Sequence, residues 1–530
     1  MSIITCISFV TFTALVVVLS WYKTRNDDLS SQDGYFLAGR SLTGVFIGGS
    51  LMLTNLSTEQ MVGLNGQGYK YTMAVMAWEV TSAFALVLMS QVFLPRYLKS
   101  GITTIPNFLE ERYDSCTRRI ISILFLIGYM AAYLPTVLYS GAVVLNSIFN
   151  VPEVFGIGQM QALIMTVWAI GIVGSIYAIF GGLKAVAVSD TYNGVGLLIG
   201  GFMITVFALI KLGGGSLAQG VDTLITVHPE KLNSIGGADS PVPWTVLFTG
   251  MLFNNLFYWC TNQSIVQRTF GAKNLAEGQK GVLLAGFFKL FGPLYLVLPG
   301  IIAFHLYGGS LSNQDMAYPT LVVDVLPKSL AGFFAAVLFG AILSSFNSAL
   351  NSSVTLFTLD IYRPIFKPNS TDEELVHVGK KFGAILAIIS MVIAPLIINA
   401  PSGLYNYLQE CNGFYNVPIL AAILVGFFSK KVPSIAPKIA LVFHIIFYSI
   451  SKIVWEHVNF LHVLGFLFPA CVVVMLIIGK IKPRENDYVQ KYTKQVDITP
   501  WSKSKLVSIV ISILMICVYI LFSKIGIVCK

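Results

Sequence analysis

The chain has 530 residues, of which 55% are hydrophobic and only 11% are charged, and its formal net charge is +9. Soluble globular domains carry about 25% charged residues, so this composition and the mean hydropathy of +0.75 exclude a set of water-soluble domains. The positive charge does not indicate nucleic-acid binding, because its distribution along the chain follows membrane topology. We predict an all-α membrane protein that forms one domain over residues 1–530.

Residues 3–22 form the first apolar run, which contains no charged side chain. Its 20 residues are enough to cross a hydrocarbon layer of about 30 Å. No basic segment precedes this run and no small-residue cleavage site follows it, so we interpret it as a retained membrane helix and not as a signal peptide. About fourteen spans are predicted, near residues 3–22, 43–64, 73–95, 120–148, 158–180, 190–212, 242–264, 281–306, 330–356, 378–399, 403–428, 436–453, 458–479 and 506–526.

The loops between the spans are mostly short. The longest extracellular loop, residues 213–241, is expected to contain a surface helix, and residues 362–381 are expected to form a cytoplasmic connector. With the N-terminus outside, 26 of the 34 Lys and Arg residues fall in cytoplasmic loops and six fall outside, in agreement with the positive-inside rule. We therefore expect a multi-pass protein of the bacterial plasma (inner) membrane, surrounded by the lipid bilayer, with both termini outside and no nucleic-acid partner.

The seven cysteines have no paired spacing, and the six histidines form no HExxH motif. A disulfide framework or a zinc site needs such spacing. No Ser-His, His-metal or paired-carboxylate pattern is present in the sequence either, so we do not expect an enzyme.

Polar residues interrupt two spans at matching positions. The second span meets the run Asn55–Gln60 (NLSTEQ), and the seventh contains Phe253–Gln263 (FNNLFYWCTNQ). Such runs are costly in lipid unless they line a cavity or an unwound helix, and paired broken helices are typical of inverted-repeat secondary transporters. Repeat one then covers about residues 43–212 and repeat two about 242–428, before C-terminal helices at about 436–526. The alternative is that the amides only link neighbouring helices.

Four ionisable side chains lie within or near the ends of spans, and each is a functional candidate because a buried charge in the membrane is costly. They are Glu59, Glu79, Asp190 and Lys289. Lys289 lies at mid-span, where the alternative to a binding role is a structural ion pair with a buried acid. Glu79 faces either a water-filled vestibule or the membrane interface. Asp190 lies near the cytoplasmic side and is expected to be structural or related to coupling.

The polar side chains at the interrupted spans are largely neutral. Amides both donate and accept hydrogen bonds, as hydroxyl groups do, and the charges of Glu79 and Lys289 cancel. Trp78, Tyr258 and Trp259 offer flat apolar faces. This lining favours a neutral, hydroxyl-rich solute over an anion, and its polar members are Asn55, Gln60, Ser82, Asn255, Asn262 and Gln409.

A candidate ion site lies in the ninth span, within the run Ala341–Ser348 (AILSSFNS). A small hard cation needs oxygen ligands, which hydroxyls and the carbonyls of an unwound helix supply. The alternative is a packing face of small residues. The residues alone do not separate sodium coupling from proton coupling.

At these residues the chain resembles the sodium/solute symporter family, and most closely its bacterial sodium/sugar cotransporter branch. The resemblance covers about residues 34–431. It implies fourteen helices with a five-plus-five inverted-repeat core of the LeuT type. The motifs that carry it are Asn55–Gln60, Tyr177–Asp190, Tyr258–Gln263, Gln267–Thr269, Gln279–Gly281 and Asn351–Tyr362.

The resemblance also implies site residues, position by position. The implied solute contacts are Asn55, Gln60, Glu79, Ser82, Asn255, Lys289 and Gln409. The implied gates are Tyr258 on the cytoplasmic side, with Asn262 as its hydrogen-bond partner, and an outer lid of Leu64, Trp78 and Tyr405, whose side chains depart from the family pattern. The implied sodium ligands are the carbonyls of Leu53, Leu56 and Ala341 and the hydroxyls of Ser344 and Ser345. A second ion or coupling site is matched only partly, by Asp190, Asn347 and Ser348.

The resulting hypothesis is a secondary symporter that moves a neutral sugar, a hexose such as galactose or glucose, into the cell with sodium. One alternative is a sodium-coupled transporter of another polyol or of a sugar acid, such as myo-inositol or sialic acid. Another is a solute sensor that does not transport.

Overall fold

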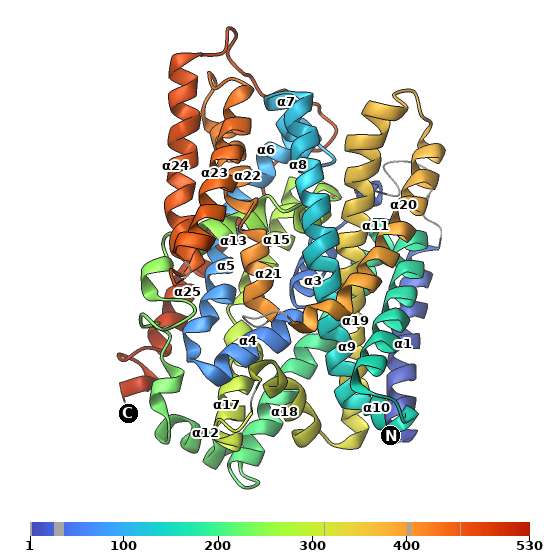
Figure 1. Ribbon diagram of the computed structural model, residues 1–530, viewed down its shortest axis with the longest axis vertical. Helices are drawn as coiled ribbons and strands as arrows, with labels where there is room; N and C mark the ends of the chain where they lie inside the picture. The colour runs from blue at the N-terminus through green and yellow to red at the C-terminus, as the bar shows by residue number, and fades with distance from the viewer. Residues whose placement is uncertain (1–2, 26–35, 312, 400–403, 456, 530) are drawn as a thin grey trace.

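The computed structural model describes residues 3–25, 36–311, 313–399, 404–455 and 457–529. Within these residues the structure is helical, apart from one isolated bridge between Leu42 and Ala272. Most helices run along the long axis of the molecule, and both chain ends lie toward the same end of it (Figure 1). The prediction of an all-α fold is confirmed.

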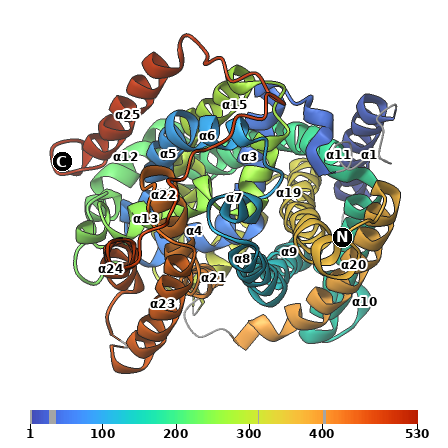
Figure 2. The ribbon, with the colours of Figure 1, turned by 90° about the horizontal axis from the view of Figure 1, so that it is seen from above.

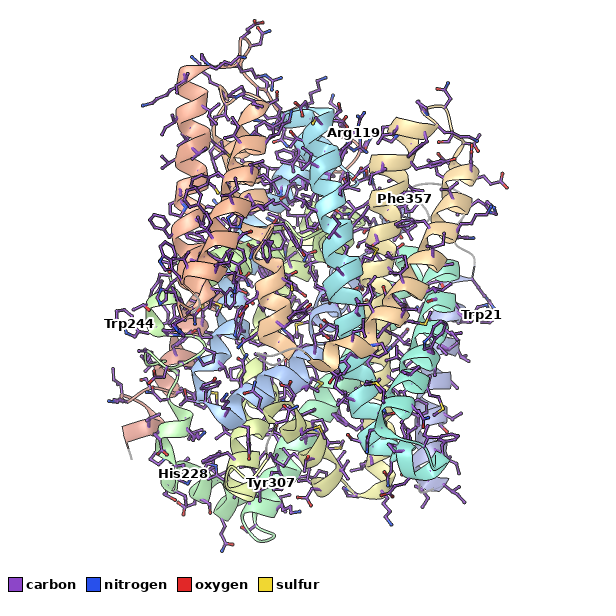
Figure 3. The ribbon with its side chains drawn as sticks, in the orientation of Figure 1. Trp21, Arg119, His228, Trp244, Tyr307 and Phe357 are labelled. Atoms are coloured by element: carbon purple, nitrogen blue, oxygen red, sulfur yellow. The ribbon has the colours of Figure 1, made fainter. Side chains whose placement is uncertain are left out.

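The outer surface of the helix bundle is apolar. Ile3, Ile453 and Phe466 are each more than 70% exposed, and Trp21 and Trp244 project from opposite flanks (Figure 3). In water, apolar patches this extensive mark interaction surfaces or aggregation sites. Here Ile3, Trp21, Ile453 and Phe466 lie on helices that are long and apolar enough to cross a membrane.

Ten helices in the described residues are long and apolar enough to cross a membrane, or up to twelve if each of two bent pairs is one span. The ten are Ile3–Thr24 (α1), Met73–Ser100 (containing α5, Ala77–Leu88), Ser115–Phe149 (containing α8, Ser115–Gly128, and α9, Leu134–Phe149), Gln159–Ile176 and Val186–Leu212 (both within α11, Gln159–Leu212), Lys328–Phe366 (beginning with α19, Lys328–Thr355), Asp372–Ile398 (beginning with α20, Asp372–Ile393), Ile435–Val454 (α23), Phe460–Ile481 (α24) and Ser504–Leu521 (α25). The bent pairs are α15 (Leu275–Lys289) with Gly292–Tyr307 at 54°, and α21 (Leu404–Asn412) with α22 (Asn416–Phe428) at 47°. The predicted count of fourteen is not confirmed.

The two interrupted spans are broken helices, as the polar runs predicted. The first consists of α3 (Gly44–Asn55) and α4 (Thr58–Lys70), and the second of α13 (Gly250–Cys260) and α14 (Gln263–Phe270). Ser57 and Asn262 have extended backbone at the two breaks and start the following helices. Each segment is too short to cross the membrane alone, because an α-helix rises only about 1.5 Å per residue.

The predicted spans 158–180 and 190–212 correspond to two membrane-length segments of α11, Gln159–Ile176 and Val186–Leu212, and the chain changes direction between them. Gly174 packs against Phe346, whereas Asn193 packs against Gly340, six residues away on α19. On a straight helix, Gly174 and Asn193 would lie about 28 Å apart. The chain therefore turns between them and passes α19 twice.

The expected surface helix in the long extracellular loop is present as α12 (Leu217–Thr226). The expected connector over 362–381 is wrong. After α19, a π-helix continues to Phe366, and α20 begins at Asp372 with the Thr371 side chain capping its first turn. Only residues 367–371 lie between these helices.

The helices that carry the predicted site lie in the middle of the bundle. α3 packs against α11 and α15, α19 packs against α11 and α1, and α13 packs against α5. Seen from above, α3, α4, α13 and α19 are surrounded by the other helices (Figure 2). Their polar residues are therefore shielded from lipid.

Candidate functional site

A central cavity lies where the two broken helices meet α5 and α21. Its walls come from residues far apart in the sequence, and most of their side chains are polar or aromatic. The lining residues are Asn55, Glu59, Gln60, Trp78, Ser82, Tyr133, Asn254, Asn255, Tyr258, Trp259, Tyr405, Leu408, Gln409 and Asn412. Five of the seven predicted solute contacts are among them. The other two, Glu79 and Lys289, are not.

Glu79 and Lys289 form a fully buried ion pair behind the cavity wall, with 2.6 Å between Lys289 Nζ and Glu79 Oε2. Lys289 also donates to Asn55 Oδ1 and lies 5.1 Å from the centre of the Trp259 ring. Gln60 Nε2 donates to Glu79 Oε1 at 3.0 Å. The pair therefore holds two cavity residues, Asn55 and Gln60, in place and leaves no net charge of its own.

Amide and hydroxyl groups connect the cavity walls. The Ser82 hydroxyl donates to its own helix at Trp78 O (2.7 Å) and to Asn255 Oδ1 (3.2 Å). Asn255 Nδ2 donates back to the hydroxyl of Thr81 at 2.6 Å. These bonds tie α5 to α13 and orient the Asn255 amide.

Asn254, next to Asn255, also lines the cavity, although the sequence patterns did not identify it. Its Nδ2 donates to Gln409 Oε1 at 3.4 Å, and its Oδ1 accepts from Asn416 at 2.7 Å. The sequence feature that could have identified Asn254 is the pair of consecutive asparagines at 254–255. Two consecutive helical residues point about 100° apart, so both can face a cavity at the end of a broken helix.

The expected lid residues are buried and pack on one another. The Trp78 and Tyr405 rings meet edge to face at 5.3 Å, and Trp78 also stacks on Phe460 at 6.5 Å. Leu64 is fully buried but does not line the cavity. In this conformation, Trp78 and Tyr405 therefore cover the cavity on their side.

The two residues expected at the cytoplasmic gate do not pair with each other. Tyr258 lines the cavity and interacts with Asn55. Asn262 Oδ1 accepts from Tyr129 Oη at 2.6 Å and from the Ser264 hydroxyl at 3.0 Å, and it caps α14. The Asn262 side-chain oxygen therefore supplies a hydrogen-bond acceptor at the helix break. An acceptor is needed there because the first N–H groups of a helix have no partner within that helix.

The candidate sodium ligands lie where α3 ends beside α19. The break after Asn55 leaves the Leu53 carbonyl without its helical partner, since Ser57 N donates to Asn55 O instead of Leu53 O. The Ser345 hydroxyl reaches Thr54 O at 3.3 Å. The Ser344 hydroxyl is buried, makes no hydrogen bond of normal geometry within the described residues, and interacts with the Asp190 carboxyl group. Such a hydroxyl near the free Leu53 carbonyl fits an all-oxygen cation site.

Asp190 belongs to a buried network with an arginine that the sequence patterns did not single out. Arg268 Nη2 lies 3.8 Å from Asp190 Oδ2, and Ser50 bridges them, donating to Asp190 Oδ2 (2.7 Å) and accepting from Arg268 Nε (2.8 Å). Arg268 also donates to Ser348 Oγ. Of the residues matched to a second ion, Asp190 and Ser348 thus both contact a cationic side chain, and Asn347 Oδ1 is buried without a partner among the described residues.

The sequence feature that could have identified Arg268 as a buried residue of the site is its place in the motif Gln267–Thr269. Charge counting places it in a cytoplasmic loop, whereas it is 1% exposed in α14. A buried arginine needs a partner, and the partner lies 78 positions away in the sequence, which charge counting does not reveal.

Comparison with known proteins gives consistent matches over most of the chain. The family model described as "Sodium:solute symporter family" matches residues 35–435. The chain is 54% identical to an uncharacterized symporter, YidK, of Escherichia coli (strain K12), over 98% of this chain and 91% of that protein. It is 34% identical to the sodium/glucose cotransporter of Vibrio parahaemolyticus, over 82% of each chain.

Among solved structures, the chain is similar to a Na+-coupled sialic acid symporter in a substrate-bound outward-open state. The TM-score is 0.76 at 21% identity, and the match covers 92% of this chain and all of that chain. At this identity the likeness establishes a common fold.

Proposed function

Because this chain belongs to the sodium:solute symporter family, we propose that it carries a neutral sugar, a hexose such as galactose or glucose, into the cell together with sodium. The resemblance found in the sequence is confirmed. The family fixes the class of activity, solute transport across a membrane with sodium as the coupling ion. The identity of the solute and the residues that bind it are our proposal.

Unpartnered polar atoms in the central cavity carry this proposal. Gln60 Oε1 and Glu59 Oε2 are acceptors, and Trp78 Nε1 is a donor, and all three are buried with no partner among the described residues. Leaving such groups unsatisfied costs about 1–3 kcal/mol each. A hydroxyl both donates and accepts, so a solute with several hydroxyls satisfies acceptors and donor together.

The aromatic side chains of the cavity complement these polar atoms. Trp78, Tyr405 and Tyr258 lie around it, and the C–H faces of a sugar ring are apolar. The 34% identity to a sodium/glucose cotransporter supports the same solute class. We therefore assign the solute contacts to Asn55, Gln60, Ser82, Asn255 and Gln409, and assign Glu79 and Lys289 to positioning Asn55 and Gln60.

The proposed coupling runs through one short segment. Leu53 and Leu56, whose carbonyls are candidate sodium ligands, lie within eight residues of the solute contacts Asn55 and Gln60. Sodium held between this segment and Ser344 and Ser345 of α19 fixes the break and orders the solute contacts. Each ligand then raises the affinity for the other by the same factor, and the membrane potential adds about 2.3 kcal/mol per charge per 100 mV.

We further propose that the protein resides in the bacterial inner membrane with both termini outside. The two chain ends lie toward the same end of the molecule, together with α12 (Figure 1), as this orientation requires. The basic segment from Lys480 to Lys505 ends in the first turn of α25 and belongs on the opposite, cytoplasmic side.

The test is uptake by proteoliposomes that contain the purified protein. Labelled galactose, glucose, myo-inositol and sialic acid are supplied with an inward sodium gradient, with equal sodium on both sides, and with a proton gradient alone. We expect concentrative uptake of a neutral hexose only with the sodium gradient. Uptake of sialic acid but of no neutral sugar would overturn the proposed solute.

A further inference from the structure

Glu59 is the only carboxylate among the described residues that line the central cavity. It is 3% exposed and is the second residue of α4, directly after the first helix break. Its Oε2 atom has no hydrogen-bond partner among the described residues. This buried acid faces the cavity and offers a free acceptor atom, but it is not among the five solute contacts assigned above.

The other buried acids of the described chain each have a cation. Glu79 pairs with Lys289, and Asp190 lies beside Arg268. Asp360 pairs with Arg118 at 2.5 Å and also accepts from Thr104 and Ser122. No ion pair to Glu59 is present within the described residues. Glu59 is therefore the one buried acid of the described residues that has no cation partner.

Two features explain why Glu59 has no cation partner at this position. Glu59 lies in the first turn of a 13-residue helix, where the unpaired N–H groups and the helix dipole favour negative charge. Lys289, the buried cation behind the cavity wall, donates instead to Glu79 and Asn55. Glu59 therefore presents to the cavity a carboxyl group that has no cation partner among the described residues.

We propose that Glu59 is a solute-recognition residue that accepts a hydrogen bond from a solute hydroxyl and excludes solutes that carry a carboxylate. This inference rests on the proposed function and narrows it to uncharged sugars and polyols. Like charges a few ångströms apart at a low effective dielectric repel strongly enough to lower affinity on the order of a hundredfold or more. The hydrogen bond to a carboxylate is also stronger than one to a neutral acceptor.

The test uses two pairs of sugars that differ only in one group, glucose with glucuronate and galactose with galacturonate. Inhibition of labelled hexose uptake is measured in proteoliposomes at saturating sodium for the parent, Glu59→Gln and Glu373→Gln. Glu373 is exposed at the start of α20, so its substitution makes the same change in charge outside the cavity. We expect the parent and Glu373→Gln to require at least 100-fold more uronate than hexose for equal inhibition.

In Glu59→Gln, we expect this ratio to fall at least tenfold while hexose affinity weakens about tenfold. An unchanged ratio in a variant that still takes up hexose overturns the role of Glu59 and leaves the proposed function standing. If the parent protein takes up an acidic sugar and no neutral sugar, both the proposed role of Glu59 and the proposed function are overturned. If myo-inositol is the neutral solute taken up, inositol serves as the label and the same uronates as inhibitors.

A second variant covers the case in which Glu59→Gln does not fold. Glu59→Asp keeps the charge and withdraws it by one methylene. We expect it to keep the exclusion of uronates and to bind hexose more weakly than the parent. Loss of the exclusion in Glu59→Asp, with hexose uptake retained, contradicts the proposal.

Discussion

Lys289 and Glu79 neutralise each other across 2.6 Å behind the cavity wall, although they are 210 positions apart in the sequence. Each holds a cavity residue, since Lys289 donates to Asn55 and Glu79 accepts from Gln60. The binding role and the structural ion pair, which the sequence presented as alternatives, are therefore joined in one arrangement. Removing either charge disturbs both fold and site.

Lys289→Ala is expected to abolish transport and to destabilise the folded protein. It leaves Glu79 buried without a cation, which costs about 3–5 kcal/mol. Combining Lys289→Met with Glu79→Gln removes both charges, so we expect much of the stability to return while transport remains absent. Thermal unfolding in detergent, together with sodium-driven uptake, measures the two effects. If Lys289→Ala alone is as stable as the parent, the ion pair between Lys289 and Glu79 does not stabilise the fold as proposed.

Asn262→Ala is expected to act on the helix break and not on a gate. The substitution removes the cap of α14 and the acceptor for Tyr129, and loss of a cap costs about 0.5–2 kcal/mol. Asn262→Asp keeps an oxygen in the same place and should retain most of the stability. Thermal unfolding of both variants checks this. Normal stability with altered solute release in Asn262→Ala would restore the expected gating role.

Polar runs inside apolar spans were enough to predict the helix breaks, because lipid offers no hydrogen-bond partners for such runs. The runs at Asn55–Gln60 and Phe253–Gln263 coincide with the ends of α3 and α13. Local composition was sufficient there, since the cost of burying polar backbone is local. Three of the proposed solute contacts on the cavity wall, Asn55, Gln60 and Asn255, lie in these runs, whereas Ser82 and Gln409 lie outside them.

The sequence patterns could not predict which charged residues, far apart in the chain, form ion pairs. Glu79 and Lys289 were each recognised as unusual, but only the packing of α5 against α15 brings them together. Arg268 resembles a loop charge because it follows a break, and Asp190 faces it only once α11 has turned. The connector expected at 362–381 was wrong because its Pro, Asn and charged residues are compatible with helix ends.

Arg268→Met is expected to destabilise the protein by about 3–5 kcal/mol, because it leaves Asp190 buried without its cation. Asp190→Asn in the same chain should recover much of that loss, since Ser50 can still bond the amide. A double-mutant cycle on unfolding temperatures measures the coupling. Additive effects of the two substitutions would show that Arg268 and Asp190 do not interact, against the 3.8 Å contact.

Ser344→Ala combined with Ser345→Ala should raise the sodium concentration for half-maximal uptake at least tenfold, while solute affinity at saturating sodium changes much less. Both hydroxyls lie on α19 beside the end of α3, and the remaining candidate ligands are carbonyls that substitution leaves intact, so the ion site is weakened and not removed. Ser353→Ala is the matched control, because Ser353 is buried on the same helix and, among the described residues, donates to Ala349 O of its own helix. Uptake is measured against sodium concentration with the proton gradient clamped.

Since the solute contacts come from other helices, equal losses of sodium and solute affinity would point to a general defect in packing. An unchanged sodium dependence would remove Ser344 and Ser345 from the ion site.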